Sequence, residues 1–145
     1  MIAVRTDVDQ LADKGAQVAL ARILVADDHE AVRNKIVHLL EQQFDVLGAM
    51  SDGRSFLKAV DRLKPDLCVL DISMPDMSGI DVAQRIKQRD PQMKIVFVTL
   101  HDDLDFRAAA LEIGAEGYVT KAKMGGELLF AVREILAGGR FFRTG

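Results

Sequence analysis

The chain alternates short apolar runs with longer segments in which apolar residues recur every three or four positions. A short continuous apolar run is typical of a strand buried on both faces, as in parallel sheets. Five such runs predict strands at 22–26, 46–50, 67–70, 95–99 and 116–120. Glycine, proline and aspartate punctuate the connections between them, which favours short turns.

The segments between the strands carry apolar residues at helical spacing. In the first segment these residues fall at i, i+4, i+7 and i+8, on one face of a helix. The apolar positions of the five predicted helices are Val32, Ile36, Leu39 and Leu40; Phe56, Ala59, Val60 and Leu63; Val82, Ala83 and Ile86; Leu104, Ala108 and Leu111; and Leu128, Val132, Ile135 and Leu136. We expect these faces to pack on a sheet.

Strands that alternate with helices predict an α/β fold with a parallel sheet, because parallel strands need crossover connections. Five strands fit the flavodoxin-like (βα)5 doubly wound order 2-1-3-4-5, with the glycine-containing second strand at an edge. The length of 145 residues fits one domain. We assign 22–140 to this domain, 1–21 to an N-terminal extension of unknown role, and 141–145 to a C-terminal tail or the start of a linker.

Composition narrows the function classes. The net charge of −3 and the scattered Lys and Arg residues argue against nucleic-acid binding by this chain and against attraction to an anionic membrane. No apolar run approaches the roughly 18 residues that indicate a membrane span. Asp7, Asp9 and Asp13 are unlike a secretory signal, so we expect a cytoplasmic protein. Cys68 lies inside an apolar run and is expected to be a buried core residue.

Polar residues follow four of the five predicted strands. Asp27 and Asp28 follow the first strand, Asp71 the third and Lys121 the fifth, and Thr99 ends the fourth. Ligands bind outside the carboxyl ends of parallel strands where the strand order reverses, here between the first and third strands. Each residue alone has an ordinary explanation, such as ending a strand, capping a helix or lying in solvent. Their arrival at one edge of the sheet indicates a shared site.

Three carboxylates at one place repel one another unless a cation neutralises them. We expect no histidine or thiolate in the cluster, and oxygen ligands alone predict a hard cation, Mg²⁺ or alternatively Mn²⁺. Asp71 is the candidate nucleophile, because a carboxylate facing the metal can attack phosphorus and become an aspartyl phosphate. Lys121 can supply positive charge to one phosphoryl oxygen, and the Thr99 hydroxyl can donate to another.

Together these residues resemble the receiver domain of two-component response regulators. The matching motifs are Val25-Ala26-Asp27-Asp28-His29, Leu70-Asp71-Ile72-Ser73-Met74-Pro75-Asp76-Met77-Ser78-Gly79, Val98-Thr99 and Gly117-Tyr118-Val119-Thr120-Lys121. The resemblance implies that Asp71 accepts a phosphoryl group from a histidine kinase or a phosphotransfer protein. Such a domain is not an enzyme for other substrates, since it catalyses only its own phosphorylation and dephosphorylation.

The resemblance also implies a set of metal ligands. Asp28, Asp71 and the backbone carbonyl of Ser73 would bind Mg²⁺ directly, and Asp27 would act through a water molecule. Ser73 and His101 line the expected entrance to the site. We predict that these two residues tune the lifetime of the phosphate.

For signalling, the resemblance implies a switch. Thr99 and Lys121 would hold the phosphoryl oxygens, and Tyr118 would turn into the space that Thr99 leaves, changing the surface of the fourth helix, fifth strand and fifth helix. The alternative for Tyr118 is a half-buried ring with its hydroxyl in water. Many receivers have proline after the lysine, often with a cis bond, whereas Ala122 follows here, so the geometry of this bond is left open.

The C-terminal segment indicates a subclass. Residues 131–142 are similar to the end of receivers in LuxR/NarL-type transcription regulators, just before their linker and helix-turn-helix domain. Two interpretations stay open: a receiver portion of a longer DNA-binding regulator, or a single-domain regulator that acts through protein contacts. Homodimerisation on phosphorylation is compatible with both.

Two rival classes fit less well. A Mg²⁺-dependent phosphatase of the haloacid-dehalogenase type usually has a carboxylate two residues after its nucleophile, where this chain has Ser73. A flavodoxin-like binding protein should have a Ser-, Thr- and Gly-rich loop after the first strand to cradle phosphate. Here Asp27, Asp28 and His29 occupy that position, and the two carboxylates would repel phosphate.

Overall fold

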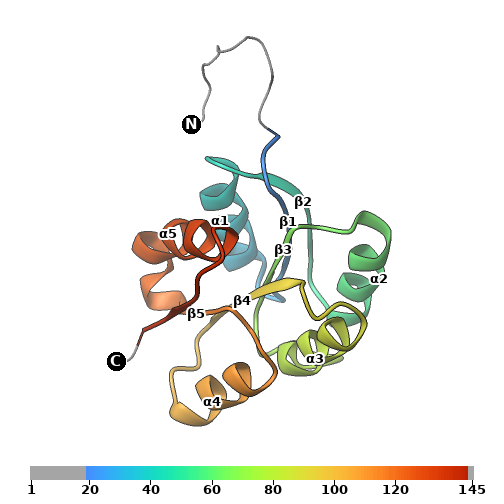
Figure 1. The fold of residues 1–145 in the computed structure, drawn as a ribbon, viewed down its shortest axis with the longest axis vertical. Helices are drawn as coiled ribbons and strands as arrows, with labels where there is room; N and C mark the ends of the chain where they lie inside the picture. Colours follow the sequence, from blue (N-terminus) through green and yellow to red (C-terminus); the bar gives the residue numbers. More distant parts are fainter. Residues whose placement is uncertain (1–18, 144–145) are drawn as a thin grey trace.

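The computed structural model describes residues 19–143, which form one sheet flanked by helices (Figure 1). The strands are β1 (Arg22–Ala26), β2 (Asp45–Met50), β3 (Leu67–Leu70), β4 (Lys94–Thr99), β5 (Gly117–Thr120) and β6 (Phe141–Phe142). Their order is β2-β1-β3-β4-β5-β6, and every neighbouring pair is parallel. The predicted flavodoxin-like order 2-1-3-4-5 is therefore confirmed.

Helices cover both faces of the sheet. They are α1 (Glu30–Glu41), α2 (Gly53–Leu63), α3 (Gly79–Arg89), α4 (Leu104–Glu112) and α5 (Met124–Leu136), and a short 3-10 turn, η1 (Lys121–Lys123), precedes α5. Residues of α1 and α5 pack in one apolar cluster, and residues of α2, α3 and α4 pack in another. Figure 1 shows these two groups of helices on opposite sides of the strands.

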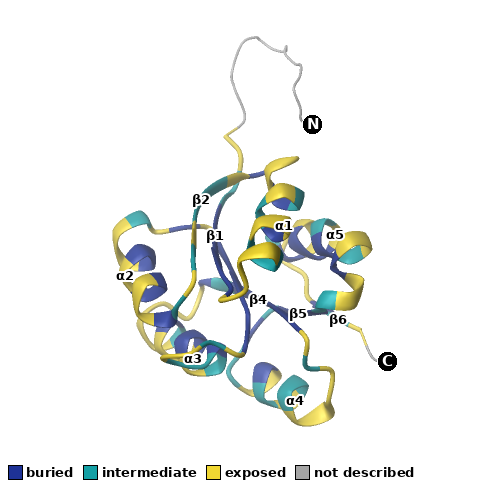
Figure 2. Ribbon diagram, turned by 180° about the vertical axis from the view of Figure 1, so that it is seen from behind, coloured by how far each residue is buried: buried dark blue, intermediate teal, exposed yellow. Residues whose placement is uncertain are grey.

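The strand pattern explains the two clusters. Along β1, Ile23 and Val25 belong to the α1 and α5 cluster, whereas Leu24 and Ala26 belong to the other, because successive strand side chains point to opposite faces. The residues of β3 are all buried, as expected for a strand covered on both faces. The neighbouring strand β4 is buried except at its first residue, and Figure 2 shows it in dark blue. The sheet thus lies between two apolar layers.

Two elements differ from the sequence interpretation. Phe141 and Phe142, assigned to a tail or linker, instead form a sixth strand paired with Gly117 and Tyr118. A two-residue strand is too short to produce a periodic sequence signal. In α4, the expected packing face is wrong: Leu104 and Leu111 are exposed, and the small Ala110 is the residue buried in the core.

Further expectations are settled or lie outside the described part. All peptide bonds described, including Lys121–Ala122, are trans. Cys68 is buried as predicted, and burial raises the pKa of its thiol. Residues 1–18 of the predicted N-terminal extension lie outside the described residues. Among the helices between residues 19 and 143, none has the length and apolar character needed to cross a bilayer.

Candidate functional site

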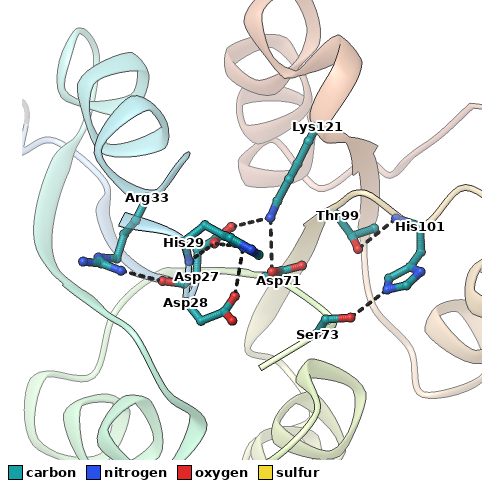
Figure 3. A network of polar contacts seen from close by, with 9 residues as sticks. All are labelled: Asp27, Asp28, His29, Arg33, Asp71, Ser73, Thr99, His101 and Lys121. Carbon is teal, nitrogen blue, oxygen red and sulfur yellow. Dashed lines mark hydrogen bonds and ion pairs between the residues drawn. The ribbon is translucent and has the colours of Figure 1, made fainter. Parts of the chain in front are cut away.

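The ends of β1 and β3 place two acidic side chains in one pocket. Ala26 and Leu70 are register partners, so the residues that follow them, Asp27 and Asp71, lie side by side at the carboxyl edge of the sheet. The Asp71 backbone N–H donates to the Ala26 carbonyl at 2.9 Å, which fixes this alignment. Asp27 is fully buried and Asp71 is 3% exposed. Figure 3 shows the two side chains close together below Lys121. The predicted convergence of these two residues is confirmed.

Lys121 faces both carboxylates. It directly follows β5, and its Nζ lies 2.9 Å from Asp27 Oδ2 and 3.2 Å from Asp71 Oδ2. Its side chain is only 6% exposed. One ammonium group therefore faces two buried acids, which leaves the site one positive charge short of balance.

Burial and the neighbouring charges shift two pKa values. Burial and then repulsion by Asp27 raise the pKa of Asp71 above its ordinary value, against the opposing effect of Lys121. Burial lowers the pKa of Lys121, but its close ion pair with Asp27 and the charge of Asp71 outweigh burial and raise it. Lys121 is therefore charged at neutral pH, and the site favours any further cation that reaches the carboxylates.

A divalent cation fits these residues. Asp27 Oδ2 is buried and accepts no hydrogen bond of ordinary geometry, although it faces the Lys121 ammonium. One ligand atom each from Asp27, Asp28, His29 and Asp71 lie within 4.8 Å of one another. The oxygens suit Mg²⁺ or Mn²⁺.

The expectation of a cluster without histidine is wrong. The His29 backbone N–H donates to Asp27 Oδ1 at 2.8 Å, and this turn brings His29 Nδ1 to 3.1 Å from Asp28 Oδ1. His29 is the N-cap residue of α1, its side chain makes no capping hydrogen bond, and the imidazole is more than half exposed. A histidine nitrogen makes the ligand set less strictly selective for hard cations than oxygens alone.

The loop after β4 lies beside the acids. Thr99 is fully buried, and its Oγ1 accepts a hydrogen bond from the His101 backbone N–H at 3.2 Å. The His101 ring nitrogen Nε2 lies 2.7 Å from Ser73 Oγ, so the two side chains meet across the opening (Figure 3). A cleft of about 440 Å³ begins there and is lined by Asp28, Ser73, His101 and Phe106 among others. Ser73 and His101 thus lie at the entrance, as predicted.

Tyr118 is buried rather than half-buried. Its ring is 1% exposed and its hydroxyl donates to the His101 carbonyl at 2.6 Å, so the alternative of a hydroxyl in water is wrong. Burial raises the pKa of Tyr118 to about 12.

Two residues of this region were missed by sequence reasoning. The Arg107 guanidinium lies over the Tyr118 ring, 4.7 Å from its centroid. Arg33 Nη1 donates to the Asp27 carbonyl at 2.9 Å. Only the i+3 spacing of Arg33 from the N-terminus of α1 and the position of Arg107 on α4 would have hinted at these contacts.

Comparison with known proteins agrees with this geometry. Residues 23–133 match the family described as the response regulator receiver domain. The chain belongs to this family. This receiver is 34% identical over 124 residues to the response regulator GacA of Pseudomonas viridiflava, covering 84% of this chain and 58% of GacA. It is 30% identical over 122 residues to the transcriptional regulatory protein DegU of Brevibacillus brevis, covering 83% and 52%. The receiver thus spans about half the length of these curated relatives.

Solved structures give the same family and subclass. A two-component response regulator of the LuxR family from Aurantimonas sp. SI85-9A1 superposes with a TM-score of 0.81 at 34% identity, covering 86% of this chain and 90% of that one. The signal receiver domain of the putative response regulator NarL from Mycobacterium tuberculosis gives 0.79 at 28% identity, covering 83% and 99%. This chain is therefore a two-component receiver domain of the LuxR/NarL type.

Proposed function

We propose that this receiver accepts a phosphoryl group on Asp71 in a Mg²⁺-dependent reaction. The observation that carries the proposal is the position of Lys121 Nζ, 3.2 Å from Asp71 Oδ2 in a buried pocket that also holds Asp27. A buried carboxylate next to a fixed ammonium can bear a transferring phosphoryl group, whose charge the ammonium stabilises.

The donor is a histidine kinase or a phosphotransfer protein. An Asp71 carboxylate oxygen forms the new P–O bond while the P–N bond of the donor's phosphohistidine breaks, and the leaving imidazole takes up a proton from solvent. Lys121 holds one phosphoryl oxygen, and the Thr99 hydroxyl donates to another. Asp27, by its charge, keeps Lys121 protonated and oriented.

Mg²⁺, with Mn²⁺ as an alternative, would neutralise charge on the phosphoryl oxygens when bound. Asp28, Asp71 and the Ser73 backbone carbonyl would hold it directly, and Asp27 would hold it through water. The two buried acids beside a single ammonium group leave a net negative charge, which supports a cation here. Thr99 and Tyr118 would carry the conformational switch. Because the Tyr118 ring is already buried, we propose that the conformational change occurs in the loop after β4, whose His101 carbonyl accepts from the Tyr118 hydroxyl.

The output is control of transcription or of another protein. The relatives GacA and DegU bear names of a response regulator and a transcriptional regulatory protein. We propose a cytoplasmic receiver that signals through a DNA-binding domain in the same polypeptide, or through contacts with a protein, with homodimerisation as one route. The net charge of −3 gives no overall electrostatic attraction to DNA.

Incubation with acetyl phosphate and Mg²⁺, followed by intact-mass measurement, tests the site. We expect the mass of one phosphoryl group on the wild type and none on Asp71→Asn. Asp61→Asn is the matched control, since Asp61 is an exposed acid paired with Arg89 on the surface. An adduct that persists at full yield in Asp71→Asn contradicts the proposal.

A further inference from the structure

The C-terminal residues 141–143, here named the tail segment, are docked along the edge of the sheet. Phe141 and Phe142 pair with Gly117 and Tyr118 of β5, and the Phe141 backbone N–H donates to the Glu116 carbonyl at 2.9 Å. Phe141 is 5% exposed. The tail segment is therefore part of the folded receiver.

Its second aromatic ring packs on the proposed switch residue. The Phe142 and Tyr118 rings are stacked with centroids 6.2 Å apart, and the Arg107 guanidinium lies 4.7 Å from the centroid of the Tyr118 ring. Arg107 also donates to the Arg143 carbonyl and pairs with Asp102 at 2.6 Å. Arg107 thus connects the tail segment, the Tyr118 ring and the loop after β4.

A continuous set of contacts leads from this surface to Asp71. The Tyr118 hydroxyl donates to the His101 carbonyl at 2.6 Å, and the His101 backbone N–H donates to Thr99 Oγ1 at 3.2 Å. A hydroxyl can accept one hydrogen bond while it donates another, and each bond polarises the next. A phosphoryl oxygen that accepts from Thr99 would therefore strengthen the hydrogen bond that holds His101, and with it the anchor of Tyr118.

We propose that docking of the tail segment on the receiver depends on whether Asp71 is phosphorylated. Phosphorylation tightens docking of the tail segment on the surface formed by Arg107 and Tyr118. The reason is that phosphorylation fixes the loop after β4, which carries the His101 carbonyl bound by Tyr118 and the Asp102 carboxylate bound by Arg107. This inference rests on the proposed function of Asp71. Coupling of this kind is reciprocal, so the docked tail segment also favours the phosphorylated form. Whatever follows the tail segment in a longer chain would receive the signal through it.

Amide hydrogen exchange of Phe141 measures docking directly. We compare the receiver in Mg²⁺ alone with the receiver in Mg²⁺ and the phosphoryl mimic BeF3⁻. We expect Phe141 exchange to slow by on the order of fivefold or more with BeF3⁻, the scale of ordinary site-to-site coupling. Asp71→Asn should remove the change. Exchange at Phe141 that is equal or faster with BeF3⁻, in a protein whose Asp71 is modified by acetyl phosphate, overturns the inference and leaves the proposed function intact.

The reverse coupling supplies an independent test. Arg107→Gln should weaken BeF3⁻ binding by a similar factor, although Arg107 does not touch Asp71. Arg89→Gln is the matched control, because Arg89 makes an exposed ion pair with Asp61 far from the tail segment in the fold. Equal BeF3⁻ affinity for the wild type and a folded Arg107→Gln variant overturns the inference. If acetyl phosphate fails to phosphorylate the wild type, the proposed function is overturned instead.

Discussion

At the scale of single residues, the site contains two buried acids and one buried base. The pKa of Asp71 is raised by burial and by Asp27, so the folded protein binds this proton more tightly than the unfolded chain does. The stability that this group contributes is present below the ordinary pKa of aspartate, 3.8, and is lost as pH rises through the raised value. Ionised Asp71 therefore opposes folding at neutral pH when no metal is bound.

This sign predicts a stabilising substitution. In metal-free buffer at pH 7, Asp71→Asn should raise the free energy of unfolding, because it removes one buried negative charge whose pKa the fold raises. The gain should shrink toward pH 4. Urea denaturation at both pH values measures it, with Asp61→Asn as the exposed control, expected to change stability by less than about 0.5 kcal/mol. A variant less stable than the wild type at pH 7 would contradict the assigned direction.

The pair of side chains at the entrance predicts an effect on phosphate lifetime. Ser73 Oγ and His101 Nε2 are 2.7 Å apart, and both residues line the cleft beside the acids. Removing the pair with Ser73→Ala and His101→Ala should admit water and shorten the lifetime about fivefold, the factor that corresponds to one net hydrogen bond of about 1 kcal/mol. Dephosphorylation followed by intact mass over time measures this. Equal rates in the wild type and the double variant would refute the prediction.

Sequence patterns predicted the acids and the lysine but not their neighbours. Asp27, Asp71 and Lys121 directly follow strands, and strand ends in a parallel sheet meet at one edge whatever the details of the loops. His29 turns toward Asp28 only because its N–H bonds to Asp27, and a loop hydrogen bond of this kind leaves no periodic trace. The contact of Arg107 with Tyr118 depends on how α4 is placed, which no local pattern fixes.

At the scale of elements, the start of α3 is tied to the segment after β3 that carries Asp71. Gly79 is the first residue of α3, and its N–H donates to the Ile72 carbonyl at 2.6 Å. A Cβ at this position would overlap the Asp71 carbonyl oxygen. Glycine is therefore required for α3 to begin beside Asp71.

Two glycine substitutions should have opposite effects. Gly79→Ala should destabilise the receiver by about 3 kcal/mol, since the collision is with backbone that cannot move aside. Gly126→Ala, in the exposed first turn of α5, meets nothing within 4 Å and should stabilise it by about 0.5 to 1 kcal/mol through helix propensity. Thermal denaturation of the two variants measures both. A Gly79→Ala midpoint equal to the wild type would contradict the close approach.

The same elements show where sequence reasoning ends. The central strands follow from continuous apolar runs, and four helices follow from apolar residues at helical spacing. In these elements the residues that the pattern selects are the ones that pack in the core. For α4, packing uses the small Ala110, so Leu104 and Leu111 remain in solvent although their spacing is that of a packed face. For β6, two residues pair with β5 through backbone groups and one ring, a contact that requires the fold to exist first.

At the scale of the whole molecule, folding and cation binding are linked through Lys121. The receiver without metal relies on this single ammonium to offset Asp27 and Asp71, each within 3.2 Å of it. Lys121→Met should leave two buried acids uncompensated and cost about 3 to 5 kcal/mol in metal-free buffer, the range for breaking a buried ion pair. A divalent cation bound by the same acids would replace much of the missing charge.

Mg²⁺ should therefore stabilise Lys121→Met more than it stabilises the wild type. Any ligand that binds only the folded form stabilises by RT ln(1 + [L]/Kd), about 2.7 kcal/mol at a hundredfold excess over Kd, and a more negative pocket lowers Kd. Denaturation at increasing Mg²⁺ measures the stabilisation in each protein. Asp28→Asn should reduce the stabilisation by Mg²⁺ in both the wild type and Lys121→Met. If Mg²⁺ shifted the wild type and Lys121→Met equally, the cation would bind elsewhere, because a site that contains Asp27 and Asp71 must respond to the loss of the ammonium between them.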